Sequence, residues 1–467
     1  MPPATIHRAR RRRGGGDALA SIRRAKRGRE GIALILAMTA IAVLGVMLAD
    51  MHESTSTSFV VATNQRDTLR AEYLAKSSID LTRMLVMREP QVRAVVTMVY
   101  APLMGRAPPQ LPIWKFADAL LGPFCNPEGD SGGLDAAGID SGAVEGLGDI
   151  GGSCSVQAVA ENSKTNVNHP LNLPPPEARQ SMAMQIFAMT GGYQSPSSYD
   201  PLFERRDNEG QFNTRLDIIS ALADWWDTDQ ERTQFDPGAA TVTSGGGEDE
   251  IYRRYRDPYV VKNAPFDSLE EVRLVRGISD DFWATFVQPD PDDLSKEQLT
   301  IYGSGIVNPN EAAPRVLLSR LCSFRGITEQ ALCADPLEAA KFIQLISTAR
   351  MMFANVLFFT TSGDFTKFVE GGGGDPKNLY SILLSVLGPE SPLMFRPITI
   401  PAPPVSGAVN SAFVTAARIL TIQGEGRVGR VRVRIRTVAN FHDLWHPPEQ
   451  NSGSMPALGI FHYYRID

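Results

Sequence analysis

Two short segments of the chain concentrate carboxylates and could hold a cation or catalyse hydrolysis. Residues 224–229 read DWWDTD, and residues 246–252 read GGEDEIY. Carboxylates this close together repel one another unless a cation, a proton or water neutralises them. A carboxylate pair could serve as the acid and base of a hydrolase, but no partner motif for that chemistry accompanies these segments. A metal site and a solvated acidic surface therefore remain as the main alternatives.

Among metal ions, calcium suits these segments best. Calcium is a hard cation that takes six to eight oxygen ligands at about 2.3–2.6 Å, and carboxylates from two segments can supply them. The pattern is not an EF-hand loop. Counted from Asp227, the sixth residue is Arg232 where such a loop needs glycine, and the twelfth is Gly238 where it needs glutamate. We expect Trp225 and Trp226 to be buried in the protein core, on the apolar face of a helix that carries DWWDTD at its end.

The four cysteines favour disulfides over a metal site. None of them forms a Cys-x-x-Cys pair, which argues against zinc and against a thioredoxin-like centre. Two short-loop disulfides in an oxidising compartment fit better, with buried free thiols as the alternative. The candidates for these disulfides are Cys125, Cys154, Cys322 and Cys333.

The charge is distributed very unevenly along the 467 residues. Residues 7–31 hold ten basic and two acidic side chains, a net charge of +8. Because the whole chain has a net charge of −6, the remainder carries −14. A basic leader before an acidic body is typical of a chain targeted to a membrane, and it argues against nucleic-acid binding.

An uncharged segment of eighteen residues, 32–49, follows the leader and is long enough to cross a bilayer as a helix. The preceding arginines would keep the N-terminus in the cytoplasm. The helix should continue to about Met87, because an amphipathic stripe repeats at helical spacing and no proline occurs before Pro90. The stripe consists of Ala71, Leu74, Ser78, Leu81 and Leu85.

The sequence RGREG directly before IALIL resembles the processing site of type IV pilins and of the pseudopilins of type II secretion. The resemblance implies that a prepilin peptidase cuts after Gly31 and leaves Ile32 as the first residue. Most members carry a glutamate at the fifth mature position, where this chain has Leu36. Among these proteins the K-type minor pseudopilin lacks that glutamate and is the largest.

The body contains further phrases that resemble the K-type pseudopilin. ENSKTNVNH follows a strand-like run at Ser155–Ala160, and GSGIVNPNEAAPRVLLSRL comes much later; both resemble asparagine-rich K-I-N-L-N turns. The segment around residues 412–442 alternates apolar and basic residues about a Gly-rich turn, which predicts a β-hairpin, and GIFHYYRID predicts a last strand. The predicted helices are Glu177–Met189, Leu216–Trp226, Leu269–Val275, Pro336–Phe353 and Leu379–Val386.

These elements predict an α+β protein with a pilin-like fold, in which a long N-terminal helix lies on a small antiparallel sheet interrupted by a large helical domain. The predicted parts run in chain order. They are a leader (1–31), the long helix (32–89), the first part of the sheet (90–169), the inserted α-domain (170–360) and the C-terminal part of the sheet (361–467). The first part of the sheet contains an acidic Gly-rich loop at 126–153.

The resemblance also implies a ligand set and partners. It implies structural calcium at the two acidic segments, with Asp224, Asp227 and Asp229 matching the first motif and Glu248 and Asp249 the second. It implies a single-pass protein of the bacterial inner membrane with a periplasmic body. Its implied function is to cap the tip of the secretion pseudopilus, and its implied partners are the I-, J- and H-type and major pseudopilins. A minor component of a type IV pilus or DNA-uptake system is the alternative.

Two motifs could suggest other functions. GDSGG at 129–133 resembles the nucleophile segment of trypsin-like proteases, but the upstream sequence offers only His7 and His52, in the leader and at the membrane edge. Two segments resemble DNA-binding helical hairpins, yet residues 220–299 hold eighteen acidic and eight basic side chains and should repel phosphates. We therefore expect neither an enzyme nor a nucleic-acid-binding protein.

Overall fold

The computed structural model divides into two compact units, residues 1–69 and residues 70–467, and each is described by itself. Of residues 15–30 the structure describes the backbone alone. The described residues are 15–105, 107–120, 151–168, 174–194, 196–204, 206, 210–239, 241–352, 359–389, 391–441 and 458–467.

Helix α1 (Gly15–Met104) is longer at both ends than predicted. Pro90 and Pro102 lie inside it, so the prediction that the helix ends before Pro90 was wrong. A proline removes one backbone hydrogen bond and bends the helix, but it does not prevent the following residues from remaining helical. Within the described residues this is the one helix whose length and composition suit a membrane span, and its apolar residues from Ile32 to Val61 are exposed.

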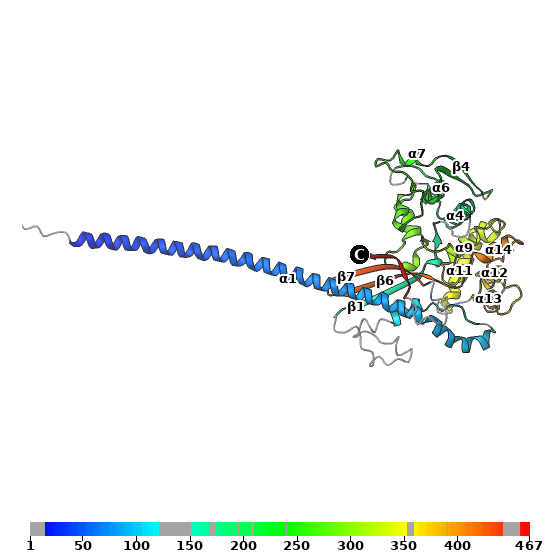
Figure 1. Cartoon of the computed structure of the whole chain (residues 1–467), viewed down its shortest axis with the longest axis horizontal. Coiled ribbons are helices and arrows are strands. Elements are labelled where there is room, and N and C mark those ends of the chain that lie inside the picture. Colours follow the sequence, from blue (N-terminus) through cyan, green and yellow to red (C-terminus); the bar gives the residue numbers. More distant parts are fainter. Residues whose placement is uncertain are drawn as a thin grey trace, which may run out of the picture. The chain divides into compact units, whose positions relative to one another are not determined.

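The second unit contains a four-stranded antiparallel sheet, which lies beside α1 (Figure 1). Its strands are β1 (Ser153–Ala160), β6 (Ile419–Val428), β7 (Val431–Asn440) and β8 (Ile460–Ile466), in that spatial order. The predicted hairpin is β6–β7. Val428 pairs with Val431, so the loop has two residues, and Gly429 adopts the positive φ of 59° that such a turn favours.

The second part of α1 packs on one face of this sheet. Its predicted stripe is confirmed at Ala71, Leu74 and Ser78, which are all buried. Two glycines of β6 let the helix backbone approach closely. A Cβ atom on Gly426 would lie 1.9 Å from the carbonyl oxygen of Ala71, and one on Gly424 would lie 2.5 Å from that of Ala75. The predicted α+β class, with a long helix on an antiparallel sheet, is confirmed.

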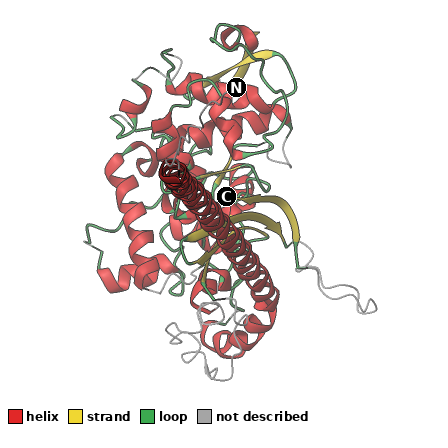
Figure 2. Ribbon diagram, turned by 90° about the vertical axis from the view of Figure 1, so that its left-hand side faces the viewer, coloured by secondary structure: helices red, strands yellow, loops and turns green. Residues whose placement is uncertain are grey.

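A large helical insertion separates β1 from β6 in the sequence (Figure 2, helices in red). Four of the five predicted helices form α-helices within one or two residues of the predicted bounds, and residues 269–274 form a 3₁₀ helix. Helices of the insertion are α4 (Pro175–Met189), α5 (Asp200–Phe203), α6 (Arg215–Trp226), α7 (Asp249–Tyr252), η4 (Leu269–Leu274), α8 (Asp280–Phe282), η5 (Trp283–Val287), η6 (Leu294–Lys296), α9 (Pro314–Leu321), α10 (Ala331–Ala334), α11 (Pro336–Met352), α12 (Ser362–Val369), α13 (Leu379–Leu387) and α14 (Val405–Ser411).

The helical insertion extends beyond its predicted end at residue 360. Helices α12, α13 and α14 share one hydrophobic core with α9 and α11, and the sheet resumes only at Ile419. Aromatic packing explains the correction, because the ring centre of Phe368 in α12 lies 6.4 Å from that of Phe342 in α11 and 5.6 Å from that of Phe395. Residues 362–411 therefore belong to the helical part and not to the sheet as predicted.

Two small sheets and a disulfide stabilise the insertion locally. Strands β2 (Thr165–Asn166) and β5 (Leu299–Thr300) pair in parallel, and β3 (Glu231–Asp236) and β4 (Thr241–Gly247) form an antiparallel hairpin. Cys322 and Cys333 form a disulfide with a Cα–Cα distance of 5.7 Å. Cys154 is also disulfide-bonded, whereas Cys125, GDSGG and most of the predicted acidic loop fall outside the described residues.

Candidate metal centre

Helix α6 carries the first acidic motif at its C-terminal end. The helix starts at a capping box, in which the Thr214 hydroxyl accepts the backbone N–H of Asp217 and the Asp217 carboxylate accepts that of Thr214. Its apolar residues pack into the core of the insertion, and Trp225 and Trp226 are both buried there as predicted. Asp224 lies in the last turn and Asp227 is the C-cap residue, so both carboxylates emerge at the same end of the helix.

The β3–β4 hairpin brings the second acidic motif to this helix end. The segment between the two motifs folds back on itself, and Glu231 at the start of β3 pairs with Gly247 at the end of β4. Glu248 follows directly, at the N-cap position of α7, and its side chain makes no capping hydrogen bond there. The hairpin therefore places Glu248 beside the residues that end α6.

Three of the five predicted ligands meet in one buried cluster. Oxygens of Asp224, Asp227 and Glu248 all lie within 4.8 Å of one another, and all three side chains are buried. Asp224 Oδ1 accepts the backbone N–H of Thr233 at 2.7 Å. Within the described part of the chain, Asp227 Oδ1 and Glu248 Oε1 have no hydrogen-bond donor. Buried oxygens without a donor are costly, so the cluster has unfilled coordination capacity.

The three carboxyl groups resist ionisation in this arrangement. Burial raises the pKa of Asp224 from 3.8 to about 7, although the Thr233 N–H opposes the shift. Burial raises the pKa of Asp227 to about 6, and the nearby Asp229 adds to the effect. For Glu248, burial and then repulsion by the neighbouring carboxylates raise the pKa to about 8. A divalent cation would remove this repulsion and favour the ionised forms.

The geometry of the cluster fits a calcium-sized ion. Calcium–oxygen bonds of about 2.3–2.6 Å place opposite ligands roughly 5 Å apart, and oxygens that all lie within 4.8 Å of one another can contact one such ion. Three carboxylates supply at least three of the six to eight oxygens that calcium takes. The two oxygens without donors belong to this set. The donor set of Asp224, Asp227 and Glu248 is therefore suited to a hard divalent cation.

The structure does not bring the other two predicted ligands into the cluster. The Asp229 carboxylate accepts the Glu231 N–H at 2.9 Å and an Arg179 N–H at 2.9 Å. The Asp249 carboxylate accepts the Val261 N–H at 3.1 Å and pairs with Arg253 at 3.1 Å. Each oxygen of these two residues thus already accepts one hydrogen bond, and neither residue belongs to the cluster of Asp224, Asp227 and Glu248.

Arg179 is a neighbour of the cluster that sequence analysis missed. Its Nη1 donates to Asp227 Oδ2 at 2.7 Å as well as to Asp229, so one guanidinium bridges two acidic residues. Arg179 belongs to α4, and no motif in the sequence connects it with DWWDTD. A cavity of about 560 Å³ borders Arg179, Asp227 and Asp229 and reaches His462 on β8, which gives solvent a route to this side of the cluster.

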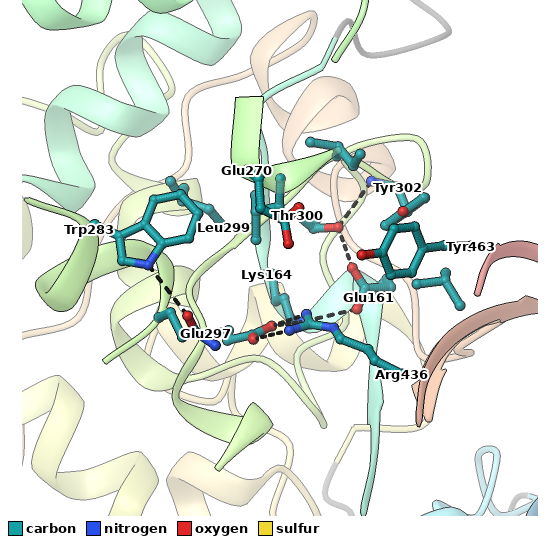
Figure 3. A pocket seen from close by; sticks show the side chains of 14 residues that line it. Glu161, Lys164, Glu270, Trp283, Glu297, Leu299, Thr300, Tyr302, Arg436 and Tyr463 are labelled. Atoms are coloured by element: carbon teal, nitrogen blue, oxygen red, sulfur yellow. Dashed lines mark hydrogen bonds and ion pairs between the residues drawn. The ribbon is translucent and has the colours of Figure 1, made fainter. Parts of the chain in front are cut away.

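A second buried cluster of charges joins the insertion to the sheet (Figure 3). Lys164 Nζ lies 2.9 Å from Glu161 Oε1 and 2.8 Å from Glu297 Oε2. Arg436 of β7 binds both oxygens of Glu297 at 2.8 Å. Burial alone would raise the pKa of Glu297, but Lys164 and Arg436 outweigh it and hold the pKa below its usual value. All four charges are paired, so this cluster is a structural connection.

No protein-family model matches the chain, and no curated protein matches it. A chain from the crystal structure of the GspK-GspI-GspJ complex of the enterotoxigenic Escherichia coli type 2 secretion system is similar over 68% of this chain and 80% of that chain. The two are 12% identical with a TM-score of 0.36, so the likeness is too weak to support a function.

Proposed function

We propose that the chain is a K-type minor pseudopilin, which sits at the tip of a type II secretion pseudopilus and is needed to export folded proteins across the outer membrane. One observation carries the proposal. An apolar N-terminal helix continues without a break into a stripe packed on an antiparallel sheet, and a large helical insertion lies between β1 and β6 of that sheet. The RGREG leader and the K-type phrases in the sequence support the same assignment.

A position at the tip is consistent with two features of the chain. Leu36 stands where most pseudopilins have the glutamate that pairs with the N-terminus of a neighbouring subunit. An insertion of this size would block further subunits from stacking above it. In this proposal the prepilin peptidase cuts between Gly31 and Ile32, the helix stays in the inner membrane, and the body is periplasmic with the I- and J-type subunits as partners.

A clean deletion of the gene tests this function. We expect release of the secreted enzymes to fall to near background and to recover when the wild-type gene is returned. A Gly31→Val variant, which blocks cleavage after residue 31, should fail to restore secretion and should keep an N-terminus longer by the leader in mass spectrometry. Normal secretion in the deletion strain would contradict the proposal, and a loss of piliation or DNA uptake alone would favour the pilus alternative.

We further propose that the acidic cluster binds calcium as a structural ion. Asp224, Asp227 and Glu248 would hold it, and the bound ion would neutralise their charges and fix the end of α6 to the β3–β4 hairpin. If calcium binds only the native state, saturation at about 100 times its dissociation constant adds about 2.7 kcal/mol of stability. Calorimetric titration and thermal melting with and without EDTA measure the effect, with Glu248→Gln as the test variant and the exposed Asp257→Asn as its control.

A further inference from the structure

The four-stranded sheet has two edges, and they differ. At the β1 edge the Asp118 carboxylate accepts the N–H of Val156 at 2.8 Å, and the Gln157 side chain binds the backbone of Leu294 at 2.9 Å. These contacts occupy part of that edge. At the other edge lies β8, a strand of seven residues. Proteins usually protect such an edge, because its unpaired backbone groups can pair with another chain.

The outward backbone groups of β8 follow from its pairing with β7. Arg434 and Asp467 exchange both backbone hydrogen bonds, at 3.0 and 2.8 Å. Hydrogen-bonded and non-hydrogen-bonded pairs alternate along an antiparallel ladder. Ile466 and Tyr464 therefore occupy non-hydrogen-bonded positions opposite β7 and direct their N–H and C=O groups to the free edge. No backbone partner for these groups occurs among the described residues.

The side chains at this edge form an exposed surface on the α1 side of the sheet, where apolar residues lie beside the charged Lys76, Glu72 and Asp80 of α1. Tyr464 is 44% exposed, Ile466 48% and Phe461 37%. The neighbouring face of α1 adds Tyr73, which is 62% exposed, and Met84, which is 51% exposed. We call these five residues the β8 edge surface. Apolar side chains gathered beside open backbone groups are characteristic of a protein-binding site.

The β8 strand is held in place by contacts on both faces. The Arg83 guanidinium of α1 donates to the carbonyl oxygens of Leu458 at 2.8 Å and Gly459 at 3.1 Å, and it stacks 4.2 Å from the ring centre of Phe461. On the opposite face Arg465 donates to Glu270 at 2.7 Å. The β8 strand is thus already ordered before a partner binds, which lowers the entropy cost of binding.

We propose that β8 receives an extended strand of a different protein chain, which joins the sheet as a fifth strand. The inference rests on the proposed function, because it places the chain in an assembly of several kinds of subunit. Backbone hydrogen bonds to Tyr464 and Ile466 would provide affinity, and apolar residues at alternate positions of the incoming strand would cover the β8 edge surface. The expected partner segment is therefore extended, uncharged on one face and free of proline.

A second copy of this chain fits the edge poorly. Two copies paired through antiparallel β8 strands are related by a two-fold axis perpendicular to the joined sheet. That axis makes the segments of α1 from residue 70 onward run in opposite directions across the joined sheet, whereas subunits anchored in one membrane are expected to run parallel. His462 is also an extra residue in the pairing with β7, and this bulge leaves only a short regular stretch for self-pairing.

Hydrogen exchange of the full-length chain in detergent tests the proposal, with purified full-length I- and J-type pseudopilins of the same organism as the probe. Exchange in the peptide covering residues 458–467 should slow about tenfold or more when a partner binds, because the amides of Tyr464 and Ile466 become hydrogen-bonded. Tyr464→Pro removes an outward N–H but no bond to β7. It should weaken binding about tenfold, which corresponds to about 1.4 kcal/mol. Tyr464→Phe keeps the N–H and should bind normally.

Ile466→Lys provides an independent variant in case the proline disturbs β8 itself, and it should also weaken binding because it places a charge on the β8 edge surface. A complex that forms with unchanged exchange in β8 and tolerates both variants would overturn the inference and leave the proposed function intact. Concentration-dependent protection of β8 in the chain alone would overturn it in favour of a second copy. Failure of every subunit to bind would count against the proposed function itself.

Discussion

Glu248 makes the stability of the cation-free protein depend on pH. Burial and the carboxylates of Asp224 and Asp227 raise its pKa from 4.5 to about 8 in the folded state. Between these two values the folded chain binds more protons than the unfolded chain, so its stability falls as the pH rises. We predict that the melting temperature in EDTA is lower at pH 8 than at pH 5, and that saturating calcium at pH 8 reverses most of the loss.

The Glu248→Gln variant is the matched test of this pH dependence. Glutamine has a similar shape but does not titrate, so the EDTA melting curve should depend less on pH between 5 and 8. Calcium should also add less stability. Asp257→Asn removes an exposed carboxylate and should leave both properties unchanged. A wild-type pH profile in Glu248→Gln would show that another group controls the effect.

At the residue scale, the sequence predicted where the acidic cluster would form but not its exact membership. Asp224 and Asp227 could be anticipated, because a spacing of three places them at the same end of a helix. Asp229 and Asp249 have the right chemistry, but nearby backbone N–H groups and arginines occupy their oxygens. Arg179 could not be anticipated, since only the tertiary packing of α4 brings it to the cluster.

Among the elements, the packing of α1 on β6 depends on Gly426. An alanine there would place its Cβ 1.9 Å from the Ala71 carbonyl oxygen, so the helix backbone must move away from the sheet. We predict that Gly426→Ala lowers the free energy of unfolding by about 1–3 kcal/mol or more, measured in urea. Gly407→Ala in α14 meets open space and should be neutral or stabilising by up to about 1 kcal/mol. Equal effects of the two variants would contradict this role for Gly426.

The Cys322–Cys333 disulfide stabilises the connection from α9 to α10. It joins residues eleven positions apart, and loop entropy gives a contribution of about 3 kcal/mol. We predict that the double variant Cys322→Ala, Cys333→Ala unfolds at a correspondingly lower urea concentration. Adding a reductant should destabilise the wild type more than the double variant. If the reductant has the same effect on both, the contribution assigned to this disulfide is wrong.

The elements themselves were largely predictable, because strong local signals determine them. The alternation around a Gly-rich turn predicted β6–β7, and apolar periodicity predicted α4, α6, α11 and α13. The β3–β4 hairpin was missed, because β4 contains three glycines and is mostly exposed, so it lacks an apolar alternation. The continuation of α1 past Pro90 was missed because proline is locally unfavourable inside a helix, although the residues on both sides of it remain helical here.

For the whole molecule, the buried pair Arg436–Glu297 connects the insertion to the sheet. Removing Arg436 leaves Lys164 alone to neutralise both Glu297 and Glu161, so Arg436→Met should cost up to about 3–5 kcal/mol of unfolding free energy. The double variant Arg436→Met, Glu297→Gln leaves Lys164 paired with Glu161, and it should cost less than the sum of the single variants. The pair Arg465–Glu270, half exposed on both sides, serves as the control and should contribute at most about 1 kcal/mol. Additive costs in the Arg436–Glu297 cycle would disprove the coupling.

Local sequence patterns could not predict where the insertion ends. The insertion ends where its second hydrophobic core ends, and that core combines Phe342, Phe368 and Phe395 from segments far apart in the chain. A sequence shows that these residues are apolar, but it does not show which core they join. The presence of an insertion was predictable from the order of elements, whereas its end depended on three-dimensional packing.

The pairing of β1 with β6 has a consequence for the order of folding. Ala160 pairs with Leu420, and beside them Glu161 and Thr421 touch across 260 residues of sequence. Closing so long a loop in an unstructured chain costs about 5 kcal/mol in entropy. The insertion therefore has to become compact first and bring the two strands together, so the sheet is completed late. Pulse-labelled hydrogen exchange during refolding should show β1 amides gaining protection after those of α9 and α11.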